Sequence, residues 1–334
     1  KMILKLEKIK KVNKIEVLII SNKLDFSTDY ITYELKKLDV PYLRINRDNF
    51  MQYSIKLLPK TTRLYFEIDN KKFYVSKKFL KSIYFRAPTF IRILKPYITP
   101  EEQLYLFQWN SFLRNLIIFG DLLWVNNPVQ TYKAENKLYQ LKIAKECGFK
   151  IPKTIITNDI KTCNIKRNEM YIIKTLEPCL LNIKNNEAFI YTNTISGKNL
   201  LQNDLKLAPI IIQELLEPKK DIRVTIVGNK IWAIKILKKG KAIKGDWRKI
   251  KKEKLEYIPI NLPDNIVNCC FKLIKSLELN YGAIDLVEYK GDFYFLEINP
   301  TGEWGWLVNQ VKFNINEELA YLLSKGKSYY EKKS

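Results

Sequence analysis

Two carboxylates and one amide near the end of the sequence could meet on paired strands. Asp285 lies inside an apolar run typical of a strand, and Glu297 and Asn299 end the next run. Period-two alternation puts Glu297 and Asn299 on one face. A three-residue turn over Lys290–Asp292 would place Asp285 directly opposite Glu297, whereas a two-residue turn would send Asp285 to the other face. The first arrangement brings three oxygen-bearing side chains together.

Such a cluster indicates a bound cation. A charged side chain in a strand core is costly unless it is paired or bound to a metal, and two facing carboxylates repel each other. Oxygen ligands without sulfur or imidazole favour Mg²⁺. The alternative is a solvated hairpin with ordinary surface acids.

The composition limits the chemistry available to the chain. Its 334 residues include no histidine, so Ser-His-Asp and Cys-His catalysis and His-ligated metals are excluded. The five cysteines are odd in number and form no Cys-x-x-Cys pair, which favours reduced thiols over a disulfide framework. Catalysis must rest on carboxylates, lysines, arginines, hydroxyls, thiols or an oxygen-held metal.

The charge is strongly positive, with 58 Lys and Arg against 35 Asp and Glu, a net +23. Nucleic acid is one partner that such a charge would attract, and an acidic peptide or a nucleotide is another. The third interpretation is a Lys-rich composition spread over the surface. Lysines occur along the whole chain without an aligned series of aromatic residues, which favours this third interpretation for most of the excess.

The elements that must position these side chains follow from hydrophobic periodicity. Apolar runs at 15–20 and 40–45 flank a helical pattern, and this β-α-β alternation predicts a parallel sheet at the N-terminus. Later patterns alternate strands and hairpins with helices, so we expect an α/β protein that becomes α+β in its C-terminal half. The expected helices cover 101–119, 134–147, 263–277 and 315–325, and the expected hairpins cover 63–75, 223–236 and 283–298.

The length predicts two or three domains. A break at Trp124–Pro128 separates an N-terminal α/β domain, 1–125, from a central subdomain, 126–208, and a C-terminal subdomain, 209–334, would carry the metal site. No targeting or membrane-spanning segment is recognisable, so we expect a cytoplasmic protein with no membrane partner.

Several motifs occur in a characteristic order along the chain. They are Glu135-Asn136-Lys137, Tyr171-Ile172-Ile173-Lys174, Gln213-Glu214-Leu215-Leu216, Asp221-Ile222-Arg223-Val224, and Asp285 followed by Glu297-Ile298-Asn299. Through these motifs the chain resembles the ATP-grasp superfamily, which implies an N-terminal parallel α/β domain and two α+β subdomains that grip ATP. The stretch between Lys174 and Gln213 contains a single glycine, so no glycine-rich phosphate loop is recognisable.

Within that superfamily the chain looks most like the microviridin-type (graspetide) ligases, which use ATP to cyclise ribosomally made peptides. The stretches that carry this likeness are 17–21 with 27–29, 44–50, 83–86, Gly245-Asp246-Trp247-Arg248 and 299–304. The resemblance implies ATP and Mg²⁺ as cofactors and, as partner, a precursor peptide with a leader and an acidic core.

The resemblance also implies roles for individual residues. Lys137 and Lys174 would neutralise ATP phosphates, Glu214 and Leu216 would meet the adenine, and Asp221 would bind the ribose or support the hinge. Arg223 would stabilise the transferring phosphate, Arg248 would hold the substrate carboxylate or acyl phosphate, and Asp285, Glu297 and Asn299 would bind Mg²⁺.

Each of these roles has a plainer alternative. The lysines could be solvated surface residues, Asp221 a turn acid, and Arg248 the partner of Asp246 in a loop salt bridge. Trp304 and Trp306 could line the site or simply pack.

The activity implied is the conversion of Asp or Glu side chains to acyl phosphates, followed by attack of a Ser or Thr hydroxyl or a Lys amine. A small-molecule ATP-grasp carboxylate–amine ligase is the first alternative, and a non-catalytic basic nucleic-acid-binding protein is the second. The sequence leaves open whether the links are esters or amides, and whether the protein is a homodimer.

Overall fold

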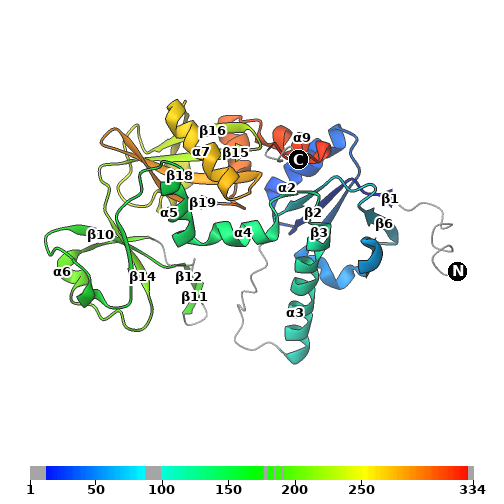
Figure 1. The fold of residues 1–334 in the computed structure, drawn as a ribbon, viewed down its shortest axis with the longest axis horizontal. Helices are drawn as coiled ribbons and strands as arrows, with labels where there is room; N and C mark the ends of the chain where they lie inside the picture. Colours follow the sequence, from blue (N-terminus) through cyan, green and yellow to red (C-terminus); the bar gives the residue numbers. More distant parts are fainter. Residues whose placement is uncertain (1–12, 87–98, 177–179, 184–185, 190–191, 330–334) are drawn as a thin grey trace.

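The computed structural model describes residues 13–86, 99–176, 180–183, 186–189 and 192–329 (Figure 1). Its N-terminal part holds the expected parallel sheet, in the strand order β3-β2-β7-β8. Asp25 begins the crossover helix α2 (Phe26–Lys37) by accepting a hydrogen bond from the Thr28 backbone N–H. The strands are β2 (Val17–Ser21), β3 (Tyr42–Asn46), β7 (Ser82–Phe85) and β8 (Leu123–Val125).

A second, mixed sheet packs beside the parallel one. Its strand order is β1-β6-β5-β4, and the predicted hairpin around Asp69 and Asn70 is confirmed as β5 and β6. Leu18 and Ile20 of β2 and Leu113 of helix α3 (Pro100–Asn115) lie in the core beneath this sheet. The strands are β1 (Asn13–Lys14), β4 (Ser54–Leu58), β5 (Arg63–Ile68) and β6 (Lys71–Ser76).

Two helices, rather than the single one expected over 134–147, lead to the central part. Helix α4 (Pro128–Glu135) ends at Asn136, whose side chain accepts from the Tyr139 N–H and so begins α5 (Lys137–Glu146). The break arises because the Asn136 backbone is extended rather than helical. Asparagine favours such a cap because its side chain replaces the missing helical partner.

The central part is a small antiparallel sheet with its own core, at the lower left of Figure 1. Its strand order is β13-β10-β14-β9, and the short helix α6 (Gly197–Leu200) covers it. The strands are β9 (Thr154–Thr157), β10 (Met170–Lys174), β13 (Asn193–Ser196) and β14 (Ile210–Glu214), beside the separate hairpin β11 (Leu180–Ile183) and β12 (Asn186–Phe189).

The C-terminal part is built on a five-stranded antiparallel sheet in the order β17-β16-β15-β18-β19. Both predicted hairpins are confirmed, as β15 with β16 and β18 with β19. The strands are β15 (Lys220–Val227), β16 (Lys230–Leu237), β17 (Glu256–Pro259), β18 (Tyr281–Tyr289) and β19 (Asp292–Asn299), with helices α7 (Asp264–Ser276), α8 (Gly305–Val311) and α9 (Ile315–Lys325).

One continuous core joins the two ends of the chain. From the N-terminal part it includes Ile31 of α2 and Tyr84 of β7. From the C-terminal part it includes Val227 of β15, Trp304 just before α8, and Leu319 of α9. Helices α2 and α9 lie against each other between the N-terminal parallel sheet and the five-stranded sheet (Figure 1). The opposite face of the five-stranded sheet is covered by α5 and α7.

Arg86 adds a polar link between the same two parts. Its guanidinium follows β7 and is buried, with Nε 3.2 Å from Asp25 Oδ2. Its Nη1 donates to the Gly302 carbonyl at 3.0 Å, and its Nη2 donates to Glu303 Oε2 at 3.0 Å. We call these residues the Arg86 cluster, and it ties the N-terminal sheet to the segment that follows β19.

Two further expectations concern the thiols and the membrane. Cys147, Cys163, Cys269 and Cys270 are free thiols, and Cys179 lies outside the described residues. Among the described residues, no helix has both the length and the apolar character needed to span a bilayer.

Candidate active site

The hairpin of β18 and β19 has a tighter turn than predicted. Tyr289 pairs with Asp292, so only Lys290 and Gly291 form the turn, and the three-residue turn is wrong. Both turn residues have positive φ, 51° and 84°, as the type I′ turn of a two-residue hairpin requires. On a regular ladder this turn would separate Asp285 from Glu297.

A β-bulge restores the predicted pairing. Leu286 lies opposite Phe295, but Asp285 lies opposite Glu297, so Leu296 is the additional residue on β19. Asp285 and Glu297 therefore face each other at the same edge of the site. Asn299, two residues beyond Glu297 and opposite Ala283, returns to the face of Glu297 by strand alternation.

Two arginines lie against this carboxylate pair. Arg223 is opposite Asp285 on the neighbouring strand, and its Nε lies 2.8 Å from Asp285 Oδ1. The Nε–H finds no aligned acceptor among the described residues, so this contact is ionic, but Arg223 Nη2 donates a long hydrogen bond to Asp285 Oδ2 at 3.5 Å. Arg248 Nη1 lies 3.0 Å from Glu297 Oε1 and 3.9 Å from Asp285 Oδ2. Neither carboxylate is left without a compensating charge.

Arg248 also makes the loop salt bridge that was its plainer alternative. Its Nε and backbone N–H each donate to Asp246 Oδ1 at 3.0 Å. The Asp246 carboxylate thus fixes the arginine from one side while Nη1 reaches Glu297. The two interpretations of Arg248 therefore describe one arrangement.

The two facing carboxylates have opposite pKa shifts. Burial raises the pKa of Asp285 to about 6, against the lowering effect of Arg223 and with the support of the Glu297 charge. Burial opposes ionisation of Glu297 as well, but Arg248 and Lys174 outweigh it and lower the pKa of Glu297 to about 2. Close cations thus stabilise the ionised form of one carboxylate more than that of the other.

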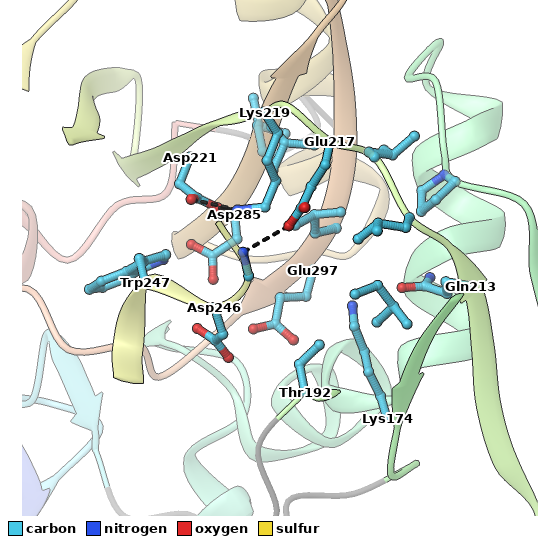
Figure 2. Close-up of a pocket in the computed structure, with 18 of the residues that line it drawn as sticks. Lys174, Thr192, Gln213, Glu217, Lys219, Asp221, Asp246, Trp247, Asp285 and Glu297 are labelled. Atoms are coloured by element: carbon cyan, nitrogen blue, oxygen red, sulfur yellow. Dashed lines mark hydrogen bonds and ion pairs between the residues drawn. The ribbon is translucent and has the colours of Figure 1, made fainter. Parts of the chain in front are cut away.

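Lys174 reaches the same cavity from the central sheet. It ends β10, and Figure 2 shows its amine directed toward the cavity that Glu297 also faces. Burial lowers the pKa of Lys174, Glu297 opposes this effect, and the nearby charges of Lys137 and Arg248 add to it. Lys137 begins α5 and donates from Nζ to the Thr175 carbonyl at 3.0 Å. Several cations crowded at one cavity make a favourable place for a polyanion.

The predicted adenine hinge forms the strand end between the two sheets. The Glu214 carboxylate accepts from the Lys153 N–H at 2.8 Å, and the Glu214 N–H donates to the Lys153 carbonyl at 3.0 Å. Its side chain is therefore used within the protein, and the hinge offers backbone groups and apolar surface instead. The apolar walls come from Ile172, Leu215, Leu216, Ile222, Leu286, Val287 and Leu296.

Asp221 lies at the far side of the cavity, bound to a lysine. Lys219 Nζ lies 2.6 Å from both Asp221 carboxylate oxygens, and a dashed line in Figure 2 marks this interaction. Burial raises the pKa of Asp221, and Lys219 opposes this effect. Asp221 therefore lines the cavity and forms an ion pair with Lys219, and it is not a solvent-exposed acid in a turn.

The two tryptophans differ in environment. Trp304 is fully buried, and its Nε1 donates to the Tyr84 hydroxyl at 3.2 Å, so it packs in the shared core. Trp306 packs against Tyr257 and Trp247, with ring centroids 4.8 and 6.4 Å away. Trp247 lines the cavity directly.

Sequence reasoning gave no site role to Lys219, Glu217 or Gln213, which also line the cavity. Glu217 accepts from the Gly245 N–H at 2.8 Å and so anchors the loop that carries Arg248. A lysine two residues before Asp221, just ahead of β15, was a usable signal for Lys219. The Glu217 contact joins segments 28 residues apart and has no local signal.

The donor set at the hairpin fits a hard divalent cation. It consists of carboxylate and amide oxygens from Asp285, Glu297 and Asn299, without sulfur or imidazole. Within the described residues no three His, Cys, Asp or Glu side chains form a fuller cage. A metal here would need further oxygen ligands from substrate or water.

A small sheet bearing cations, a larger sheet bearing facing carboxylates, and a cavity between them define a protein of the ATP-grasp class. Residues 134–323 match the RimK-like ATP-grasp domain, and the chain belongs to this family. No curated protein sequence matches the chain.

Solved structures share the fold over nearly the whole chain. One is the macrocyclase MdnC bound with precursor peptide MdnA from Microcystis aeruginosa, with 22% identity, a TM-score of 0.79, and coverage of 92% of this chain and 99% of that one. The RiPP-associated ATP-grasp ligase of Chryseobacterium gregarium, in complex with ADP and a leader and core peptide, has 24% identity, a TM-score of 0.79, and coverage of 97% and 100%. The ATP-grasp ligase PsnB with minimal precursor, Mg and ADP has 16% identity, a TM-score of 0.71, and coverage of 95% and 100%.

Proposed function

We propose that this chain is an ATP-dependent ligase that joins side chains within a ribosomally made precursor peptide. ATP would phosphorylate Asp or Glu carboxylates to acyl phosphates with release of ADP, and Ser or Thr hydroxyls or Lys amines would then displace phosphate, giving macrocyclic esters or amides. The observation that carries the proposal is the Asp285–Glu297 pair, which faces a cavity shared with Lys174 and Arg248. The RimK-like ATP-grasp family supports the use of ATP.

Residues of the central sheet, the hinge and the five-stranded sheet would together bind ATP. Lys137 and Lys174 would hold the phosphates from the central side, because crowded cations favour a polyanion. The hinge at Glu214 and Leu216 would receive the adenine through backbone groups and apolar contact, and Asp221 would lie near the ribose.

Asp285, Glu297 and Asn299 would hold Mg²⁺, which would offset the negative charge of the phosphates. Arg223 lies beside Asp285, where a permanently charged guanidinium can stabilise a transferring phosphate. Arg248 would hold the acyl group being activated, since it is already fixed by Asp246 on one side. Each step uses carboxylates, lysines and arginines, so the absence of histidine from the sequence is no obstacle.

The proposal also specifies the class of substrate, a ribosomally made precursor peptide. The structures of MdnC and of the Chryseobacterium gregarium ligase contain precursor, leader or core peptides, and this chain shares their fold over more than nine-tenths of its length. The excess positive charge would help to attract an acidic core peptide. We further propose a cytoplasmic protein with the three-part division 1–125, 126–208 and 209–334. A homodimer is left open.

The test measures ADP release with and without a peptide encoded beside the gene, followed by mass spectrometry of that peptide. The proposal predicts peptide-dependent ADP release and the loss of one water mass for each ring formed. ADP release with amino acids or other small acids, and an unchanged peptide mass, would instead favour a small-molecule carboxylate–amine ligase. Salt-sensitive DNA binding without ATP turnover would favour a nucleic-acid-binding protein.

A further inference from the structure

A buried amide side chain contacts the strand that carries Glu297 and Asn299. Gln140 lies on α5 and is 3% exposed. Its Oε1 accepts from the Ile298 backbone N–H at 3.0 Å, and its Nε2 donates to the Ile298 carbonyl at 2.8 Å. The same Nε2 donates to the Ala134 carbonyl at the end of α4 at 2.6 Å. One side chain thus binds both backbone groups of the residue between Glu297 and Asn299.

This contact matters because β19 is an edge strand. It is last in the order β17-β16-β15-β18-β19, and within the described residues the outer side of its backbone is bridged only at Tyr294, by Lys150. Unpaired backbone groups at a buried edge are unfavourable, and an edge strand can shift its register more easily than a central one. The Gln140 amide presents a donor and an acceptor together, as a paired strand would.

We propose that Gln140 is a positioning residue that fixes the β19 backbone, so that Glu297 and Asn299 keep one orientation toward the cavity. This inference rests on the proposed function, because it concerns residues that would hold the metal. The side chain of Ile298 points into the core with α5 and α7, so the residues on either side of it point the opposite way. Holding the Ile298 backbone therefore holds both neighbours.

The position of Gln140 on α5 couples two parts of the site. Lys137 lies three residues earlier on the same helix, on the same face, and its Nζ contacts the Thr175 carbonyl just after Lys174. The helix thus relates the cations of the central sheet to the carboxylates of the C-terminal sheet. Residues that orient metal ligands from behind typically change metal affinity ten- to a hundredfold when mutated.

Asn126 holds the open end of the same hairpin, beyond Ile298, in a similar manner. Its Nδ2 donates to the carbonyls of Tyr281 and Pro300 at 2.8 Å, and its Oδ1 accepts from the Tyr281 N–H at 3.1 Å. It is 1% exposed. The start of β18 and the residue after Asn299 are therefore fixed together, and Gln140 adds the hold next to Glu297.

The experiment compares Gln140→Met with Asn316→Leu in the full-length protein. Methionine keeps the length of glutamine without its hydrogen bonds. Asn316 is a similarly buried amide that donates to Glu34 at 2.9 Å, on α9 and away from the carboxylate hairpin. Mn²⁺ with ADP serves as the probe, and free Mn²⁺ is measured by electron paramagnetic resonance. We expect Gln140→Met to weaken Mn²⁺ binding about tenfold or more, and Asn316→Leu to leave it unchanged.

Two results would overturn the role of Gln140: wild-type Mn²⁺ affinity in Gln140→Met, or equal weakening in both variants. If the wild-type protein binds no Mn²⁺, the metal assignment in the proposed function is itself wrong, and this inference falls with it. Steady-state kinetics add a second readout. The Mg²⁺ concentration for half-maximal rate should rise in Gln140→Met while the KM for ATP changes less.

A measurement on the unaltered protein covers the case in which Gln140→Met does not fold. The Ile298 N–H should exchange with deuterium as slowly as the Phe295 N–H, which is bonded to the Lys150 carbonyl at 2.8 Å. Much faster exchange at Ile298 would mean that the Gln140 amide does not hold the strand in solution, and would overturn the proposal.

Discussion

Two buried clusters of acids and arginines lie at the ends of strands, and they differ in how fully their hydrogen bonds are made. In the Arg86 cluster, Asp25 accepts from Arg86 and also from the Ser21 and Thr28 hydroxyls, each at 2.9 Å. At the hairpin, Asp285 has an ionic contact with Arg223 Nε, one long hydrogen bond from Arg223 Nη2 at 3.5 Å, and a more distant Arg248. The first carboxylate accepts several hydrogen bonds within the protein, whereas the second accepts one long hydrogen bond and is otherwise balanced by charge.

The pKa values follow this difference. Burial opposes ionisation of Asp25, but Arg86 and the two hydroxyls lower its pKa below the ordinary value. Burial raises the pKa of Asp285 to about 6 despite its two arginines. A fully bonded buried carboxylate holds the fold together, whereas a balanced but underbonded one is suited to receive a cation or a substrate group. The comparison assigns stability to the Arg86 cluster and chemistry to the hairpin.

The largest expected effect comes from Glu297→Gln at the hairpin. Removing this charge should lower peptide-dependent ADP release on the order of a thousandfold, because metal-assisted charge stabilisation supplies several kcal/mol. Glu288→Gln is the matched control, since Glu288 lies on β18 and pairs with Lys220 outside the cavity. Equal activity in the two variants would contradict the metal assignment.

The converse test removes the arginine of the other cluster. Arg86→Met leaves Asp25 buried without its cation, and we expect a loss of about 3 kcal/mol in the free energy of unfolding. Denaturant titration measures that loss, and ADP binding by the folded fraction should stay near that of the wild type. A variant of normal stability that fails to bind ADP would reverse the roles of the two clusters.

A smaller effect is expected from Lys174→Met. Losing one phosphate-binding cation should raise the KM for ATP about tenfold, which is equivalent to one charge-assisted hydrogen bond. Lys142→Met is the control, because Lys142 is exposed on α5 and pairs only with Glu146 in the described structure. If steady-state kinetics give the same KM for both variants, Lys174 does not bind the phosphates.

The smallest effect is a pH dependence carried by Asp25. Its pKa is lowered in the folded protein, so its contribution to stability is present above the unfolded value and is lost as pH falls through the folded value. Unfolding titrations of wild type and Asp25→Asn at several acidic pH values should therefore converge at the lowest pH. Curves that stay parallel would show that Asp25 does not carry the shift.

The hairpin shows how much of the site could be predicted from the sequence. The pairing of Asp285 with Glu297 was predicted, but through a three-residue turn. The chain reaches the same pairing with a two-residue turn and a bulge at Leu296. The spacing of the two residues is compatible with the pairing by either route, but with a two-residue turn the pairing also needs the bulge, which the spacing does not indicate. The Lys290–Gly291 dipeptide, able to adopt positive φ at glycine, was the local signal for the tighter turn.

Other features depended on contacts between distant segments. The parallel sheet and the hairpins follow from local patterns, whereas Lys174 and Arg223 were proposed as site residues because their motifs resemble those of the ATP-grasp superfamily. The hydrogen bonds of Gln140 to Ile298 and of Arg86 to Glu303 join residues 158 and 217 positions apart in the sequence. Hydrophobic periodicity does not predict such contacts. The division into α4 and α5 could be predicted only by reading Asn136 as a cap rather than as part of one helix.

The shared core has a geometric consequence for any movement of the molecule. The N-terminal sheet and the five-stranded sheet are packed through one core, whereas the central sheet has its own. The covalent connections of the central sheet to the rest pass through the segment after α5 and the hinge before β15. A rotation about these two connections would change the separation of Lys174 from Glu297 and leave Asp285 and Glu297 at a fixed spacing. The degree of freedom available to this fold therefore opens or closes the gap between the cations of the central sheet and the carboxylates of the five-stranded sheet, without altering the carboxylate pair itself.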